Sequence, residues 1–233
     1  MPNKTVVEFI GIPGSGKSTI AKALYENFLP SSDVIMPMHG FRRVDLTFFE
    51  KVSVDLRYLS VLFPYRFRRV LYELRYFGYN LVSIKNGWER SRYPSAFFEL
   101  VKKLDAKLII LDEWLIHRTI DEDVHRYQTG IDYVGRFSLA PLSNIDKICY
   151  VLVKTNPEIA FKRILSEDQP YRHFALNKDK CRIRKVLANW EQDVKEVSAA
   201  LEAQQIPLLM INGSDPVEKN VQLLTDLLRR QVS

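Results

Sequence analysis

The run from Gly11 to Ser18, GIPGSGKS, constrains the fold of this chain more than any other feature. Its glycines permit backbone conformations that other residues rarely adopt, and they let a ligand approach the main chain closely. Successive backbone N–H groups can then point into one concavity, an arrangement that holds phosphate oxygens. The preceding Thr5–Ile10 is an apolar run typical of a buried strand, and Lys17–Phe28 has the apolar spacing of a helix. A strand, a phosphate-binding turn and a helix are therefore expected in this order.

The end of this run supplies the polar groups that a bound triphosphate needs. The helix offers its N-terminal N–H groups and the positive end of its dipole. Lys17 is expected to reach the terminal phosphates, and the Ser18 hydroxyl is expected to ligate Mg²⁺. The predicted cofactors are ATP and Mg²⁺, with ATP chosen over GTP only by default. The residues predicted to bind the nucleotide are Gly11, Ile12, Pro13, Gly14, Ser15, Gly16, Lys17, Ser18 and Thr19.

Four more apolar runs alternate with helical patterns along the chain. The apolar runs lie at residues 33–36, 107–111, 147–153 and 207–211. Helical patterns precede residue 107 and cover residues 157–166, 179–205 and 216–230. Strands that alternate with helices favour right-handed crossovers and a parallel sheet with helices on both faces. The expected fold class is therefore α/β.

Residues 41–105 differ in composition from the rest of the chain. They carry 13 Lys and Arg against 7 Asp and Glu, a surplus equal to the net charge of +6, and they contain 15 aromatic residues. The stretch is too long for a crossover and is interpreted as a helical insertion between the second and third strands. Three alternatives stay open: a packed helical pair with solvated arginines, a lid-like substrate domain that faces the phosphates, or an amphipathic element at a membrane surface. Near the end of the second strand, His39 and Arg42 fit either a substrate rim or an ordinary loop.

The apolar run at residues 107–111 ends in two carboxylates, Asp112 and Glu113. Ligands of open parallel sheets bind at the carboxyl ends of the strands. A carboxylate placed there can hold Mg²⁺, and a second one can orient or deprotonate a nucleophile. We therefore predict that Asp112 is a metal ligand and that Glu113 is the catalytic base.

A cluster of cations begins within the helix predicted at residues 157–166. A transferred phosphoryl group needs positive charges that close over it after binding. Arg163 and Arg172 are the favoured catalytic pair, although a solvated helix face explains any single member of the cluster equally well. Residues 163–185 are accordingly expected to form a lid-like segment.

The composition argues against several other classes of protein. Two cysteines, Cys149 and Cys181, cannot form a disulfide framework, which favours a reducing, cytoplasmic setting. The N-terminus has no signal-peptide pattern, and no apolar run has the length of a transmembrane helix. Nucleic acid is not an expected partner, because the basic, aromatic region comes without an RNA-binding signature. The apolar face expected within residues 54–79 fits either a core or a homodimer contact.

The chain also resembles the thymidylate-kinase branch of the P-loop nucleoside and nucleotide kinases. This resemblance is carried by the glycine-rich run, by the acidic end of the third strand and by three further stretches. Those stretches are Arg126-Tyr-Gln-Thr-Gly130 with Gly135-Arg136, the helix start from Pro157 to Arg163, and residues 206–218. The glycine-rich run is highly specific for nucleotide binding, and the other stretches are moderately specific.

The resemblance implies a single domain over residues 1–233 with a three-layer αβα P-loop kinase fold. Its five-stranded parallel sheet would have the order 2-3-1-4-5, with residues 41–105 inserted between strands 2 and 3. ATP would lie over residues 11–18, with its base near the turn after Asn212. Tyr127, Gln128 and Arg136 would line the pocket of a small-molecule acceptor.

One departure from the family pattern bears directly on the acceptor. Relatives that phosphorylate nucleotides carry Asp-Arg at the third strand end, where the arginine engages the acceptor's phosphate, whereas this chain has Asp112-Glu113. A glutamate repels a phosphate but can take a proton from a hydroxyl. The expected activity is therefore ATP·Mg²⁺-dependent transfer of phosphate to a hydroxyl of a small molecule such as a nucleoside, a sugar or a related metabolite. The alternatives are a thymidylate-like nucleotide kinase and an ATP-hydrolysing switch with a macromolecular partner.

Overall fold

The structure is a computed structural model, and it divides the chain into two compact units. One unit comprises residues 1–36, 106–138 and 143–233, and the other comprises residues 37–105 and 139–142. Each unit is described by itself. The structure describes single residues between 47 and 85 and, in addition, residues 4–28, 33–36, 104–112, 147–166, 180–203 and 205–232.

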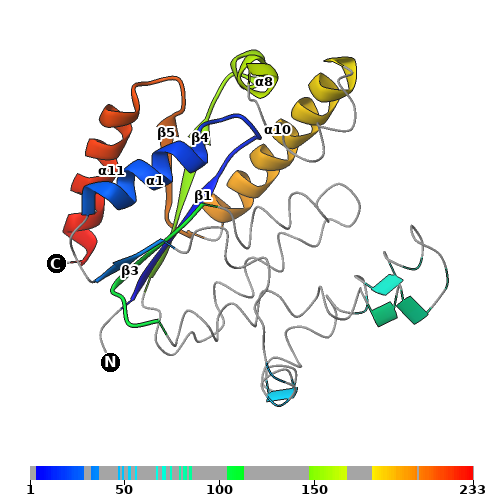
Figure 1. Cartoon of the computed structure of the whole chain (residues 1–233), viewed down its shortest axis with the longest axis horizontal. Coiled ribbons are helices and arrows are strands. Elements are labelled where there is room, and N and C mark those ends of the chain that lie inside the picture. The colour runs from blue at the N-terminus through cyan, green and yellow to red at the C-terminus, as the bar shows by residue number, and fades with distance from the viewer. Residues whose placement is uncertain are drawn as a thin grey trace. The chain divides into compact units, whose positions relative to one another are not determined.

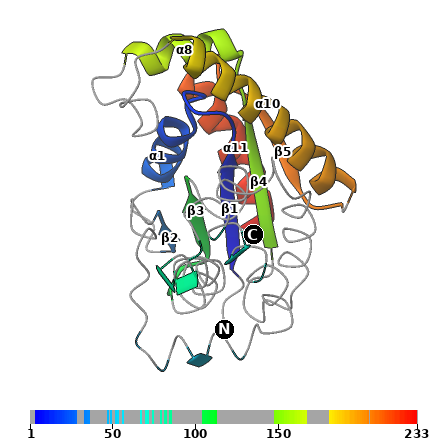
Figure 2. The same cartoon turned by 90° about the vertical axis from the view of Figure 1, so that its right-hand side faces the viewer.

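Five parallel strands form one sheet in the first unit. They are β1 (Thr5–Ile10), β2 (Val34–Ile35), β3 (Leu108–Leu111), β4 (Lys147–Lys154) and β5 (Leu208–Asn212). Their order in the sheet is β2-β3-β1-β4-β5, with β1 paired to both β3 and β4 (Figure 2). The prediction of a five-stranded parallel sheet in the order 2-3-1-4-5 is therefore confirmed.

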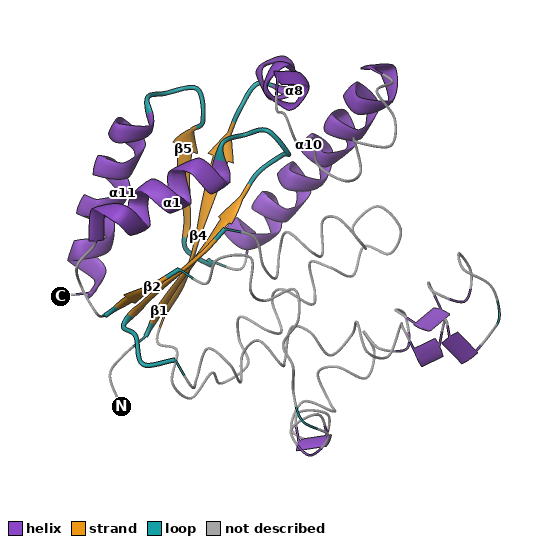
Figure 3. Cartoon of the chain, in the orientation of Figure 1, coloured by secondary structure: helices purple, strands orange, loops and turns teal. Residues whose placement is uncertain are grey.

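Helices cover both faces of this sheet (Figures 1 and 3). On one face, α1 (Lys17–Phe28) and α11 (Val217–Val232) pack against each other, and Asn27 Nδ2 donates a hydrogen bond of 2.9 Å to Thr225 Oγ1. The other face carries α10 (Lys180–Ala203). The short helix α8 (Pro157–Ser166) follows β4 and contacts α10. The predicted arrangement of helix, sheet and helix layers is thus present.

The alternation of side chains along the central strands explains the two apolar layers. Val7 and Phe9 of β1 have no exposed surface and face the core beneath α1 and α11. The residues next to Val7 and Phe9 within β1 point to the opposite face of the sheet, because successive side chains of a strand alternate. The buried apolar side chains of α10 are Ile183, Leu187, Val194, Val197 and Leu201, and their spacing makes one apolar stripe along the helix.

The C-terminal end of α10 differs from the helix predicted at residues 179–205. The helix ends at Ala203, because Gln205 adopts a left-handed φ of 57°. Ile206 N–H donates to Leu201 O and Gln205 N–H donates to Glu202 O, both at 2.9 Å. These bonds form a Schellman motif, which satisfies the last carbonyls of a helix. Glycine usually occupies this position, so the sequence carried no clear signal for the end.

The second unit is described only at scattered positions between residues 47 and 85. Most of these positions are helical, and Phe49, Phe67 and Tyr79 expose 82%, 61% and 87% of their surface. These three aromatic side chains therefore do not belong to a core of the unit. The bounds of the insertion at residues 41–105 and of the lid-like segment at residues 163–185 stay predictions. Across the described parts of the chain, no helix combines the length and apolar character that a membrane span requires.

Candidate nucleotide-binding site

The phosphate loop, residues 11–18, connects the end of β1 to the start of α1. Gly14 and Gly16 have φ values of 74° and 94°, which are strained for any residue with a side chain. A Cβ atom on Gly14 would lie only 2.6 Å from the carbonyl oxygen of Ala160 in α8. At Gly14 the glycine is therefore needed for both its conformation and its packing, and α8 presses directly against the loop.

Lys17 folds back over the loop from the first position of α1. Its side chain is buried, with 4% of the residue exposed. The ammonium nitrogen donates hydrogen bonds to Gly11 O at 3.0 Å and to Ile12 O at 3.2 Å. An ammonium held against the loop in this way lies beside the concavity expected to hold the phosphate oxygens. The position of Lys17 is compatible with its predicted role.

The first turn of α1 adds backbone donors to the same loop. Ile20 N–H bonds to Gly16 O at 3.0 Å and so begins the helical ladder. The amides of Ser18 and Thr19 precede this ladder and have no carbonyl one turn earlier in the helix. Both residues are exposed. Unused helical N–H groups and an exposed hydroxyl fit the binding of a phosphate chain and of its magnesium ion.

Asp112 directly follows β3, next to the strand that enters the loop. Leu111, the last residue of β3, pairs with Glu8 of β1, two residues before the end of that strand. The Asp112 side chain is half-buried at this carboxyl edge of the sheet. Within the described ranges, no cluster of three or more His, Cys, Asp and Glu side chains could hold a metal ion. A Mg²⁺ ion bound mainly by phosphates needs only one or two carboxylates, so this finding does not conflict with the predicted ligands Ser18 and Asp112, whose roles stay predictions.

Arg163 binds the backbone of the loop rather than pointing away from it. Its Nη1 lies 3.2 Å from Ser15 O and 3.4 Å from Gly14 O, and its Nη2 donates to Gly213 O at 2.9 Å. The guanidinium therefore bridges the phosphate loop and the turn after β5. Its predicted role, to neutralise the transferred phosphoryl group, stays a prediction.

Thr155 and Gly213 belong to the same site, although sequence reasoning did not select them. Thr155 Oγ1 donates to Ser15 O at 3.1 Å. A Cβ atom on Gly213 would collide with both Thr155 Oγ1 and Ser15 O. The positions of the two residues, just after β4 and β5, are the only sequence signal that could have identified them, because ligands bind at the carboxyl ends of parallel strands.

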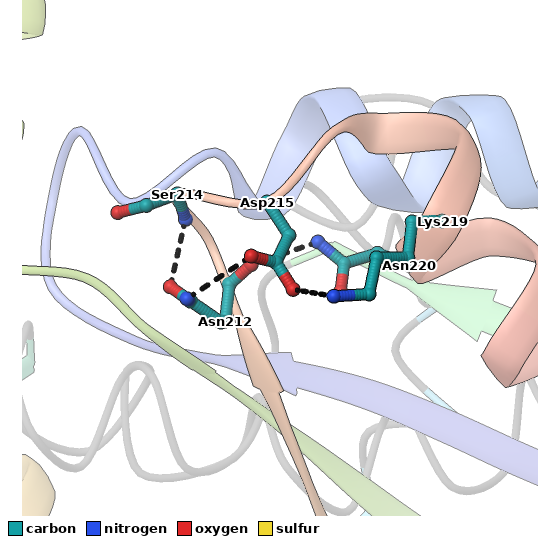
Figure 4. A network of polar contacts seen from close by, with 5 residues as sticks. All are labelled: Asn212, Ser214, Asp215, Lys219 and Asn220. Carbon is teal, nitrogen blue, oxygen red and sulfur yellow. Dashed lines mark hydrogen bonds and ion pairs between the residues drawn. The ribbon is translucent and has the colours of Figure 1, made fainter.

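The junction between β5 and α11, residues 212–220, has a hydrogen-bond network of its own (Figure 4). Asn212 Oδ1 accepts a bond of 3.0 Å from Ser214 N–H, and Asn212 Nδ2 donates to Asp215 at 3.2 Å. Lys219 Nζ donates to Asp215 at 2.8 Å, and Asn220 Nδ2 donates to Asn212 O at 2.8 Å. Several of these side chains line an open cavity of about 520 Å³ beside α11.

An exposed ion pair connects α8 to α10. Arg184 of α10 forms two hydrogen bonds with Glu158 of α8, at 2.9 and 3.2 Å, and its guanidinium lies 4.3 Å from the ring centre of Phe161. The hydrogen bond from Arg184 lowers the pKa of Glu158, and the same bond raises the pKa of Arg184. Both side chains are more than half exposed, so solvent screens this pair.

Several predicted site residues lie outside the described residues. They are the predicted base Glu113, the lid cation Arg172, and the acceptor-side residues His39, Arg42, Tyr127, Gln128 and Arg136. Their roles stay predictions. The described part of the site is therefore the part predicted to bind the nucleotide, and it lies at the ends of β1, β3, β4 and β5.

The sequence matches no protein-family model and no curated protein. Among solved structures, the chain is similar to deoxyadenosine kinase from M. mycoides with bound dATP, at 12% identity over 96% of this chain and 99% of that one, with a TM-score of 0.50. It is also similar to shikimate kinase from Bacteroides thetaiotaomicron, at 14% identity over 97% and 98% of the two chains. The TM-score of that second pair, 0.47, is too low to support an argument. The chain has the P-loop kinase fold. The narrower likeness to thymidylate kinases stays a prediction.

Proposed function

We propose that this chain is an ATP·Mg²⁺-dependent phosphotransferase that acts on a hydroxyl of a small molecule such as a nucleoside, a sugar or a related metabolite. The observation that carries the proposal is the geometry of the phosphate loop. Two glycines with positive φ shape the loop between β1 and α1, and the Lys17 ammonium is held against its carbonyls. The kinase fold supports the same reading but does not by itself establish an activity.

The chemistry follows from where charge develops. Mg²⁺ bound by Ser18, Asp112 and phosphate oxygens would withdraw charge from the triphosphate, and the P-loop amides and Lys17 would stabilise the charge that builds up during transfer. Glu113, the residue after Asp112, would take the proton of the acceptor hydroxyl. A carboxylate in that position disfavours an acceptor that already carries a phosphate. This is why a neutral acceptor is preferred over a nucleoside monophosphate.

The test is a screen of the full chain with ATP and Mg²⁺ against nucleosides, sugars and other hydroxylated metabolites, with ADP release as the readout. One class of compound should raise ADP release well above the basal rate. Lys17→Ala should reduce that increment by about 100-fold or more, and Glu113→Gln should abolish it. Glu26→Gln is the matched control, because Glu26 is an exposed carboxylate that only pairs with Lys22 on α1 at 3.8 Å.

The possible outcomes separate the proposal from its alternatives. If only nucleoside monophosphates stimulate ADP release, the acceptor is a nucleotide rather than a neutral molecule. Hydrolysis that ignores every metabolite but responds to a macromolecule would indicate an ATP-driven switch. If no compound stimulates turnover and Glu113→Gln has no effect, the chain is not a kinase of this kind.

A further inference from the structure

The Ser15 carbonyl is held by two side chains from a distant part of the chain. Thr155 Oγ1 donates to it at 3.1 Å from the segment between β4 and α8, and Arg163 Nη1 donates to it at 3.2 Å from α8. A carbonyl oxygen has two lone pairs, so this acceptor is fully used by these two donors. Both donors approach from the side of the loop that α8 covers.

Fixing this carbonyl also fixes the amide on the other side of the same peptide group. A peptide group is planar and almost always trans, so its C=O and N–H point in opposite directions. Because Ser15 O faces Thr155 and Arg163, the N–H of Gly16 must point away from them. The Gly16 carbonyl is fixed independently, since it accepts the first bond of α1 from Ile20 N–H. The N–H of Gly16 is therefore held in one orientation, opposite to the Ser15 carbonyl and away from Thr155 and Arg163.

Arg163 connects this peptide to a third segment. Its Nη2 donates to Gly213 O at 2.9 Å, so the planar fork of one guanidinium spans the phosphate loop and the start of the β5–α11 junction. Gly213 approaches so closely that a Cβ there would meet Ser15 O and Thr155 Oγ1. A lysine could keep the charge of Arg163, but its single nitrogen could not reproduce the fork.

We propose that Thr155 and Arg163 are positioning residues that hold the Ser15–Gly16 peptide so that Gly16 N–H binds a phosphate of the nucleotide. The inference rests on the proposed triphosphate site and deepens it. In this role the two residues act through the backbone, and for Arg163 this replaces the direct contact with the phosphoryl group predicted from the sequence. Hydrogen bonds to the carbonyl also polarise the peptide group and make its N–H a stronger donor. The ligand class is a polyphosphate, with or without an attached nucleoside.

Binding of tripolyphosphate and of ADP to the full chain, measured by calorimetry, tests the proposal. Thr155→Val keeps the shape and removes the hydroxyl, and it should weaken both ligands by the same factor, about 3- to 10-fold, as expected for one hydrogen bond. Thr155→Ser keeps the hydroxyl and should restore most of the affinity. Arg163→Lys should weaken both ligands by about 10-fold or more, because it removes charged bonds.

Two control variants and one double variant make the outcome specific. Lys162→Met removes a neighbouring exposed charge of α8, and Ser198→Ala removes a hydroxyl that donates only within α10, to Val194 O. Neither control should change the affinity for tripolyphosphate. The double variant Thr155→Val/Arg163→Lys should lose less than the product of the two single losses, because both side chains act on the same carbonyl.

The results that would overturn the proposal are distinct. If the wild-type chain binds neither tripolyphosphate nor ADP, the triphosphate site itself is wrong, and the inference fails with it. If the wild type binds both and the Thr155→Val and Arg163→Lys variants bind equally well, only the positioning role is wrong. A Thr155→Ser variant that binds as weakly as Thr155→Val would also overturn it, since retaining the hydroxyl would then not retain the affinity.

Discussion

The phosphate loop and the β5–α11 junction both lie at the carboxyl ends of strands, but they are stabilised in opposite ways. The carbonyls of Gly14 and Ser15 accept hydrogen bonds from side chains far along the chain, with sequence separations of 140 for Thr155 and 149 for Arg163. The network of the junction joins residues separated by only two to eight positions. The centre of the loop therefore depends on a distant part of the chain, whereas the junction has local side-chain bonds of its own in addition to the bond from Arg163 to Gly213 O.

This difference has a physical cause. A loop that turns its N–H groups toward an anion must turn the matching carbonyls the other way, where they need donors from another segment. The junction has Asn212 and Asn220, whose short polar side chains bind nearby backbone groups. Changes to Thr155, Arg163 or the α8 residues packed against the loop should therefore affect phosphate binding, and changes at the junction should affect mainly local stability.

The largest effect is expected for Gly14→Ala. The new Cβ would lie 2.6 Å from Ala160 O, and alanine would be held at a φ of 74°. A left-handed conformation costs about 1–2 kcal/mol and overpacking about 1–3 kcal/mol, so the free energy of unfolding, measured in urea, should fall by about 2–5 kcal/mol.

Gly16→Ala separates these two costs. Gly16 also has a positive φ, but a Cβ there would meet only Arg163 Nη1, at an ordinary distance of 3.5 Å. The free energy of unfolding of Gly16→Ala should therefore fall only by the conformational cost, about 1–2 kcal/mol. Equal losses in the two variants would mean that contact with α8 does not constrain the loop.

Asn220→Ala should have an intermediate effect confined to the junction. Asn220 is 2% exposed, and its Nδ2 donates to Asn212 O at 2.8 Å. Loss of this bond and of the buried amide should lower the free energy of unfolding by about 1–2 kcal/mol. Binding of tripolyphosphate should stay within about twofold of the wild type. A parallel loss of stability and of phosphate affinity would show that the junction is not independent of the loop.

A smaller effect is expected for Lys219→Ala. Lys219 pairs with Asp215 at 2.8 Å in an i,i+4 arrangement, and its side chain is 69% exposed. Such pairs contribute about 0.2–0.5 kcal/mol. The variant should therefore unfold in urea almost like the wild type, with Lys195→Ala of α10 as a matched control that breaks another i,i+4 pair. A loss several times larger than that of the control would mean that the Asp215 network is cooperative.

The strands and the loop could be predicted from the sequence because their signals are local. Thr5–Ile10 is continuous and apolar, and the spacing of glycines and lysine in residues 11–18 leaves few alternatives. The strand order came from the resemblance to P-loop kinases. The helical ends were harder, since Gln205 takes a conformation that usually belongs to glycine.

The side chains that bind the carbonyls of the phosphate loop could not be predicted in the same way. Thr155 is an ordinary polar residue after a strand, and nothing near it in the sequence indicates that it binds Ser15 O. Arg163 was selected for its charge, but its contacts with backbone carbonyls depend on how α8 packs against Gly14. Long-range contacts of this kind follow from tertiary structure rather than from local pattern.

The smallest effect concerns the ion pair that holds the outer side of α8. The hydrogen bond from Arg184 lowers the pKa of Glu158 below its ordinary value of 4.5. A lowered carboxyl pKa stabilises the fold at pH values above the ordinary pKa, and this contribution is lost as the pH falls through the lowered value. The difference in Tm between the wild type and Glu158→Gln should therefore be small and constant at pH values well above 4.5, and it should shrink as the pH falls below 4.5.

Glu218→Gln is the matched control for this pH series, because Glu218 is an exposed glutamate in the first turn of α11, as Glu158 is in the first turn of α8. Both variants lose a favourable charge at a helix N-terminus, but only Glu158→Gln also loses the bonds to Arg184. Tripolyphosphate affinity should be unchanged in both, since buried contacts such as those of Ala160 and Ile164 hold α8 near the loop. A drop in affinity with Glu158→Gln alone would show that the loop depends on the surface of α8 as well as on its packed face.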